Sequence, residues 1–140
     1  MSNSLESINL DFKKNFHNLF RKPELIQPYL LKRSNKFDEI IKKEFLRREL
    51  ETDFAIVALG GYGRKELFPS SDIDLSIIQL NLKTKKIEDI KDFIGWLWTL
   101  KVKVGHSVRT IKDIENITKS DLKEFTSYLS YRIIFCKKNK

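Results

Sequence analysis

The residues best suited to chemistry are two aspartates, Asp72 and Asp74, at the start of an apolar run that extends to Leu80. In a β-strand, residues two positions apart project from the same face. The spacing therefore predicts that both carboxylates stand side by side, with Ile73 on the opposite face. Two such carboxylates repel each other unless a cation lies between them. Mg²⁺ suits a carboxylate pair together with a phosphate, so the stretch predicts a metal–nucleotide site.

A glycine turn comes shortly before the aspartates. Gly60 and Gly61 end a second apolar run, Phe54 to Leu59. Glycines let the backbone approach an oxyanion without a Cβ in the way, and the N–H groups of a following helical turn favour negative charge. Arg64 lies within that turn and is a candidate to hold a phosphate oxygen. The turn is thus predicted to cradle a phosphate.

Each of these residues also has a simpler interpretation. The two aspartates could cap a solvent-facing turn, although two acids entering an apolar strand are costly without a ligand. Arg64 could pair with Glu66 on the surface. Tyr62, Trp96 and Trp98 are interpreted as packing residues.

Two residues of a later stretch are left open. His106 follows Gly105, where we expect a bulge or a close backbone approach, and it is interpreted as a partly buried, hydrogen-bonded histidine. Arg109 is either structural or close to the nucleotide.

The periodicity of apolar residues predicts the elements that position these groups. Helices are expected over 5–20, from the region 23–28 to 50, over 86–100, over 111–117 and from 120 or 121 to 135. Strands are expected over 54–59, 73–80 and 101–110, with a short helix or turn over 62–67 and a loop over 81–85. The order predicts an α/β (α+β) fold with a small mixed sheet of about three or more strands flanked by helices.

Composition places limits on the fold and partners. A chain of 140 residues predicts one domain, with a helical N-terminal segment (1–50) and a catalytic core (51–140). The single cysteine, Cys136, excludes an intrachain disulfide and agrees with a reducing compartment, so we expect a cytoplasmic protein. No apolar run reaches the roughly 18 residues of a membrane span.

The net charge of +8 raises the question of a polyanionic partner such as nucleic acid. The lysines are scattered among glutamates and aspartates on the predicted helix exteriors, so nucleic-acid binding is not expected. The charge runs at 42–44 and 47–49 are predicted to be solvated helix faces.

The motif resembles a known signature. A strand that ends in two glycines, followed by D-h-D on the next strand (h, an apolar residue), is similar to the nucleotidyltransferase superfamily typified by DNA polymerase beta. The string L-G-G-Y-G-R-K-E-L-F-P-S-S-D-I-D-L, from Leu59, resembles more closely the N-terminal domain of the bacterial PII protein uridylyltransferase family. Leu97-Trp98 and the string V-G-H-S-V-R-T, from Val104, match the same family, so the resemblance covers roughly residues 54–110.

The resemblance implies a reaction. The two aspartates would hold one or two Mg²⁺ ions, and UMP would pass from UTP to a tyrosine of the PII signalling protein. Gly60, Gly61 and Arg64 would hold the β- and γ-phosphates, and Ser71 would add a hydroxyl donor.

Two departures from the family stand out. Many members carry a third carboxylate on the following strand, credited as general base, but residues 101–110 contain no Asp or Glu. The base is therefore open between His106 and a metal-bound hydroxide. The family is also several times longer, with an HD-type hydrolase domain and glutamine-sensing ACT domains. No His-Asp pair occurs here, so we interpret the chain as a fragment of a longer architecture.

Two alternatives to a uridylyltransferase remain at this point. One is a stand-alone minimal nucleotidyltransferase that adenylylates another protein, although such enzymes usually read G-S-x-A-R-G, which this chain lacks. The other is a truncated, inactive nucleotide-binding module.

Overall fold

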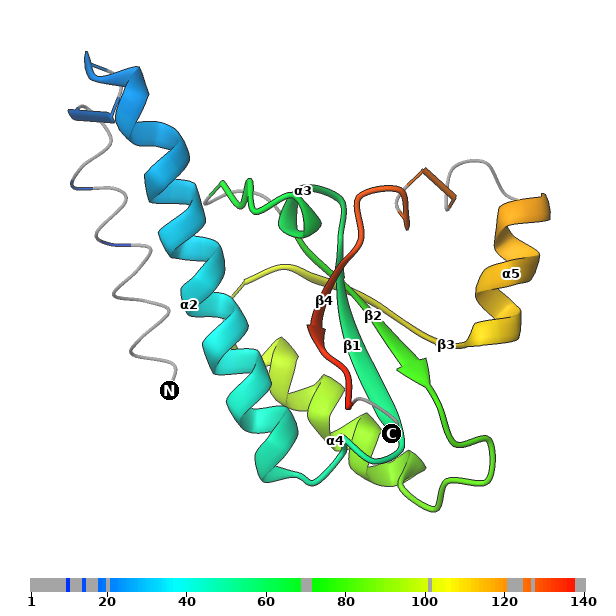
Figure 1. Ribbon diagram of the computed structural model, residues 1–140. Helices are drawn as coiled ribbons and strands as arrows, with labels where there is room; N and C mark the ends of the chain where they lie inside the picture. Colours follow the sequence, from blue (N-terminus) through cyan, green and yellow to red (C-terminus); the bar gives the residue numbers. More distant parts are fainter. Residues whose placement is uncertain are drawn as a thin grey trace.

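The computed structural model describes residues 10, 14, 18–19, 21–68, 72–100, 102–120, 125–126 and 128–137. Most of the helix predicted over 5–20 lies outside these residues, as does Ser71. The elements, in chain order, are η1 (Pro23–Leu25), α2 (Ile26–Arg47), β1 (Phe54–Leu59), α3 (Gly60–Gly63), β2 (Ile73–Gln79), α4 (Ile87–Trp98), β3 (Val104–Thr110), α5 (Ile111–Ser120) and β4 (Arg132–Phe135) (Figure 1). The predicted α/β fold is confirmed.

Within the described residues, four strands form one mixed sheet in the order β3-β2-β1-β4. β1 pairs antiparallel with β2 and with β4, whereas β2 pairs parallel with β3. The two central strands are almost continuously apolar and buried, as strands covered on both faces are. The parallel pair is joined through α4, which supplies the long crossover that parallel strands need.

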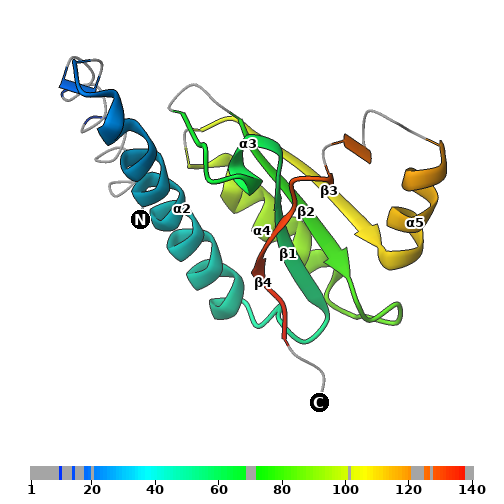
Figure 2. The same ribbon diagram turned by 45° about the horizontal axis from the view of Figure 1, so that its top comes forward.

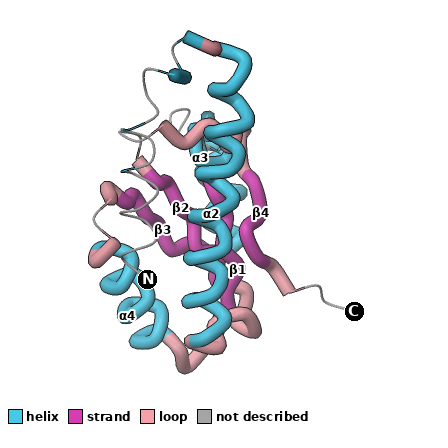
Figure 3. The backbone as a smooth tube through the Cα atoms, turned by 90° about the vertical axis from the view of Figure 1, so that its left-hand side faces the viewer, coloured by secondary structure: helices cyan, strands magenta, loops and turns pink. Residues whose placement is uncertain are grey.

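The main core lies between the sheet and the helices α2 and α4. Phe37, Ile41 and Phe45 of α2 are fully buried there, against Ile56 of β1 and Phe93 of α4. α2 runs across the front of the sheet in the view from its own side (Figure 3). The opposite sheet face carries a smaller apolar cluster under Ile114 of α5 and Tyr128. α2 and α5 thus lie on opposite sides of the strands (Figure 2).

The prediction for the C-terminal region is wrong at its end. Residues 132–135 form β4, not the last turns of a helix, and β4 adds a fourth strand at the edge beside β1. The run Arg132-Ile-Ile-Phe135 is rich in β-branched and aromatic residues, which favour an extended backbone. Apolar residues at 125, 128, 129 and 133 also fit helical spacing. Residues 132–135 form a strand because they can pair with the edge of β1 that β2 leaves open.

The short element after β1 also differs from its predicted bounds. The helical turn begins at Gly60 and ends at Gly63, instead of covering 62–67. Gly60 and Gly61 are therefore part of the helical turn, whereas the sequence predicted that they precede it.

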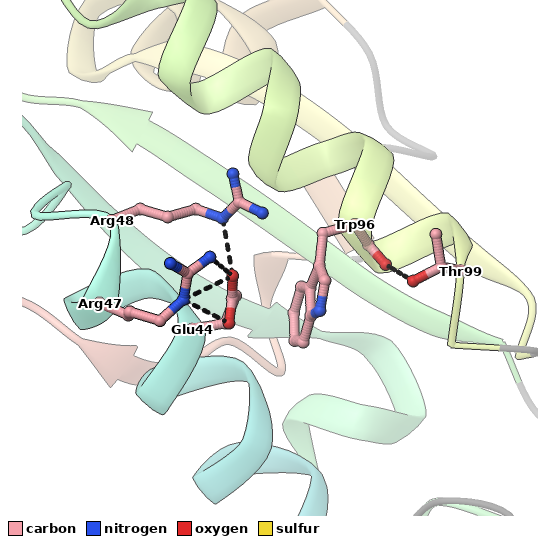
Figure 4. A network of polar contacts seen from close by, with 5 residues as sticks. All are labelled: Glu44, Arg47, Arg48, Trp96 and Thr99. Carbon is pink, nitrogen blue, oxygen red and sulfur yellow. Dashed lines mark hydrogen bonds and ion pairs between the residues drawn. The ribbon is translucent and has the colours of Figure 1, made fainter. Parts of the chain in front are cut away.

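The charge run at 42–44 is not wholly solvated, as had been predicted. Glu44 is buried (3% exposed), and its carboxylate accepts hydrogen bonds from Arg47 Nε (3.1 Å to each oxygen) and Arg48 Nε (2.9 Å) (Figure 4). These bonds, foremost those from Arg47, lower the pKa of Glu44. The pairing lets a carboxylate stay charged inside the α2–α4 layer.

The two tryptophans behave differently. Trp96 is partly buried and stacks on Phe93 with ring centroids 5.7 Å apart, so its predicted packing role is confirmed. Trp98 is 62% exposed and is not a packing residue. Among the described residues, no helix is long and apolar enough to cross a membrane.

Candidate active site

The pairing of β1 with β2 brings the glycine turn to the aspartates. Leu59, the last residue of β1, lies opposite Asp74 in the antiparallel register. Gly60 follows directly and adopts a φ of 57°, a conformation that residues with a Cβ rarely take. The chain therefore turns into α3 immediately beside the Asp74 carboxylate. The end of β1 and the start of β2 thus meet at one point.

Asp74 is held between two glycines, Gly60 of the α3 turn and Gly105 of β3. In the parallel register it lies opposite Gly105 of β3. A Cβ added at Gly105 would lie 2.7 Å from Asp74 Oδ1, and one added at Gly60 would lie 3.5 Å from Asp74 Oδ2. The expected close backbone approach at Gly105 is confirmed, and its purpose is to leave space for this carboxylate.

Asp72 lies just outside β2, close enough to affect its neighbour. Asp74 is exposed to solvent on one side, but partial desolvation of its carboxylate, and then the negative charge of Asp72, raise its pKa. Asp72 itself is 43% exposed in its side chain, and Lys103 Nζ lies 3.7 Å from its Oδ2. Asp72 is therefore near enough for its charge to act on Asp74, with one ammonium group at its outer side.

An open cleft of about 260 Å³ extends from Asp74 along the sheet face that α5 partly covers. Gly105, Ser107 and Arg109 alternate along β3, and all three line the cleft. Arg109, left open by the sequence, is therefore a cleft residue on the same face as Asp74.

A chain of hydroxyl groups lies next to the cleft. Ser76 is fully buried two residues after Asp74, and its Oγ lies 2.7 Å from the Tyr128 hydroxyl, with which it shares a hydrogen bond. Ser107 Oγ donates to Ser76 Oγ at 3.5 Å. Ser76 was not among the predicted site residues, although a serine at i+4 from Asp72 in an apolar run continues the same face.

His106 also borders the cleft, but its ring projects from the other face of β3. It is paired with Leu75, which belongs to the core under α4, and its ring centroid lies 5.6 Å from that of Trp98. The residue is exposed, so the prediction of a partly buried histidine is wrong. Because its ring leaves the sheet on the side opposite Asp74, the structure does not support His106 as the general base.

Arg64 lies at the end of the glycine turn and is half exposed. Its Nε donates to Glu66 Oε2 at 3.2 Å and its Nη1 to Ser130 Oγ at 3.3 Å. Arg64 Nη2 would lie 3.8 Å from a Cβ at Gly61, so the guanidinium stands beside the turn. The pairing with Glu66 is confirmed, whereas a phosphate contact stays a prediction.

The glycine turn is fixed from behind by an ionic cluster that the sequence did not reveal. Arg132 of β4 donates to the carbonyl oxygens of Tyr62 (3.1 Å) and Gly63 (3.3 Å). The same guanidinium donates to Asp38 of α2 at 2.5 and 3.2 Å. Tyr62, which is fully buried as expected for packing, donates its hydroxyl to Asp38 at 2.6 Å. We call Asp38, Tyr62 and Arg132 the clamp.

The donor set fits a hard divalent cation. Asp74 is a carboxylate whose ionised form is disfavoured by burial and by a like charge, and a cation between the two aspartates would relieve both effects. Among the described residues, no group of three or more His, Cys, Asp and Glu side chains comes together. Two carboxylates with open positions are the arrangement in which Mg²⁺ is completed by substrate phosphates and water.

We predict that Gly105→Ala lowers nucleotidyl transfer by roughly 10- to 100-fold, because the new methyl group must displace the Asp74 carboxylate. The free energy of unfolding should change by less than about 1 kcal/mol, since only the end of a side chain has to move. Steady-state rates and chemical denaturation check both parts. Gly95→Ala is the control, because a Cβ at Gly95 meets nothing within 4 Å and should leave the rate unchanged. A wild-type rate in Gly105→Ala would contradict the assigned place of Asp74.

Comparison with known proteins covers the whole of this site. The sequence profile of the nucleotidyltransferase domain family matches residues 38–136. The chain is 33% identical over 120 residues to a bifunctional uridylyltransferase/uridylyl-removing enzyme of Aliivibrio fischeri. Proteins of the same description are 40% identical over 106 residues in Pseudoalteromonas translucida and 36% over 110 residues in Cupriavidus metallidurans. These alignments include 84%, 74% and 78% of this chain, but only 14%, 12% and 13% of the relatives.

Proposed function

The chain belongs to the nucleotidyltransferase domain family, and from that membership we propose that it transfers UMP from UTP to a tyrosine of a PII signalling protein. Similarity to uridylyltransferases over most of the chain supports the choice of nucleotide. The chain spans about an eighth of the length of those relatives, so the proposal concerns the transfer reaction only. The proposed setting is the cytoplasm, since the reaction consumes a nucleoside triphosphate.

One observation carries the proposal: the Asp74 carboxylate lies directly beside Gly60, the first residue of the glycine turn. Strand pairing thus brings together a carboxylate pair and a glycine turn, which are the two parts that metal-assisted phosphoryl chemistry requires. We propose that Asp72 and Asp74 hold Mg²⁺. Bound there, the ion would neutralise charge on the triphosphate and lower the pKa of the attacking hydroxyl.

The protein's own part in the reaction is binding and orientation. The backbone of Gly60 and Gly61 and the guanidinium of Arg64 are proposed to hold the β- and γ-phosphates, with Ser71 as a further donor. The phenolic oxygen of the acceptor tyrosine attacks the α-phosphorus of UTP. The bond from that phosphorus to the bridging oxygen of the β-phosphate breaks, pyrophosphate leaves and the phenolic proton is released to solvent. The clamp keeps the turn in place while this charge develops.

The test is transfer of label from UTP to PII. The purified chain is incubated with Mg²⁺, PII protein and UTP labelled at either the α- or the γ-phosphorus. We expect label on a PII tyrosine from the α-position only, and none with Asp74→Asn. Label from α-labelled ATP instead of UTP would show an adenylyltransferase. Triphosphate binding without transfer to PII would overturn the proposed reaction.

A further inference from the structure

The side chain next to the aspartate pair on the neighbouring strand is a cation. Lys103 immediately precedes β3, and Ile73 N donates to its carbonyl oxygen at 2.9 Å. Because Ile73 lies opposite Val104 in the parallel register, Lys103 and Asp72 occupy adjacent places one residue before the strands begin to pair. The backbone therefore places the two residues next to each other, and Lys103 Nζ lies 3.7 Å from Asp72 Oδ2.

The position of this charge matters for any cation that enters the site. The two carboxylates carry two negative charges, and Lys103 compensates one of them. A free divalent ion would meet the ammonium group at short range and be repelled by it. A metal–triphosphate complex still carries net negative charge, so the same ammonium group attracts it. The charge arrangement therefore favours a metal that arrives on the nucleotide over a metal bound alone.

The Lys103 side chain is exposed enough to contact Asp72 in the empty site and a phosphate group in the occupied site. Its side chain is 82% exposed, and within the described part of the chain Asp72 is the carboxylate with which it forms an ion pair. A lysine ammonium on a four-carbon stem can rotate toward a new anion without any change in the backbone. Lysine is also a common ligand of phosphate groups, as a point charge.

We propose that Lys103 is a triphosphate-binding residue of this site. Its ammonium group neutralises Asp72 while the site is empty, and it moves to a phosphate oxygen when the metal–nucleotide complex binds. This inference rests on the proposed function, because it requires a triphosphate at Asp72 and Asp74. It assigns to the chain a phosphate ligand that comes from β3 and is separate from the glycine turn.

The experiment measures two affinities in the same variants. Binding of Mn²⁺ alone is followed by electron paramagnetic resonance, and binding of a Mg²⁺ complex with an α,β-imido analogue of UTP by calorimetry. The variants are Lys103→Met and, as a charge-matched control, Lys91→Met on α4, which pairs with Glu88 away from the cleft. Asp74→Asn tests whether binding occurs at the aspartates.

The two affinities should move in opposite directions. We expect Lys103→Met to bind Mn²⁺ alone about fivefold more tightly, because a repelling charge is removed, and the Mg²⁺–analogue complex about tenfold more weakly. Lys91→Met should match wild type in both. Equal values in Lys103→Met and wild type would show an ordinary surface ion pair and overturn the inference, as would a shift of both affinities in the same direction. If wild type itself binds no analogue, or binds it equally well as Asp74→Asn, the proposed function fails as well.

Discussion

Asp74→Asn should reduce nucleotidyl transfer by at least about a thousandfold. The substitution keeps the shape of the side chain but removes the charge that faces Gly60, and a lost electrostatic contact to a developing phosphate charge is worth several kcal/mol. Among the described residues, Asp72 is the carboxylate whose charge acts on Asp74. Because Lys103 partly neutralises Asp72, we expect Asp72 alone to hold the metal less well than the pair. Single-turnover transfer from α-labelled UTP measures the loss.

The same substitution should not weaken the fold. Burial and the charge of Asp72 raise the pKa of Asp74, so the folded chain binds that proton more tightly than the unfolded chain does. The contribution of Asp74 to the free energy of unfolding is therefore greatest below the ordinary pKa of an aspartate, and it decreases as pH rises through the raised pKa of Asp74. At neutral pH the ionised carboxylate destabilises the empty site. We expect Asp74→Asn to gain a few tenths of a kcal/mol after solvent screening, and the gain should vanish below about pH 3.

Opposite effects on activity and stability separate this prediction from simple unfolding. Asp92→Asn, at an exposed aspartate of α4, is the control and should change neither quantity. An Asp74→Asn variant that is clearly less stable at pH 7, with transfer reduced only in proportion to its unfolded fraction, would contradict a catalytic place for this carboxylate.

The core of the fold could be predicted from the sequence because its signals are local. Continuous apolar runs predict β1 and β2, and both begin and end within one residue of the expected positions. Helical periodicity predicts α2 and α4 in the same way. The period-2 rule also predicts a shared face for Asp72 and Asp74; Asp72 lies one residue before β2, so that face stays a prediction.

The remaining features depend on partners far apart in the chain. β4 is a strand because the edge of β1 is free, and no pattern within residues 128–137 contains that information. His106 was interpreted without its register, and only the pairing with Leu75 shows that it faces Trp98. Asp38 and Arg132 are 94 residues apart, and each falls on a segment that the sequence indicated as helical. Sequence patterns thus predicted the candidate residues Asp72, Asp74 and the glycine turn, but not the ionic cluster that holds the turn in place.

Arg132→Met should reduce both the stability of the fold and the affinity for UTP. The guanidinium has four acceptors, two on Asp38 and the carbonyl oxygens of Tyr62 and Gly63. Its removal leaves a largely buried carboxylate with the Tyr62 hydroxyl as its remaining clamp partner, at a cost of about 2–4 kcal/mol. It also frees the carbonyl oxygens of the glycine turn. We expect the KM for UTP to rise about tenfold, because the turn no longer keeps its place beside Asp74.

A matched substitution separates loss of positioning from loss of stability. Arg47→Met also removes an arginine from a buried carboxylate, Glu44, but that pair lies at the far end of α2 from the glycine turn. It should lower the free energy of unfolding and leave the KM for UTP unchanged at temperatures where both variants are folded. Arg132→Lys should restore charge but not the forked geometry, and so recover stability more than affinity. Equal KM values for Arg132→Met and Arg47→Met, measured on folded protein, would show that the clamp serves stability alone and does not position the turn.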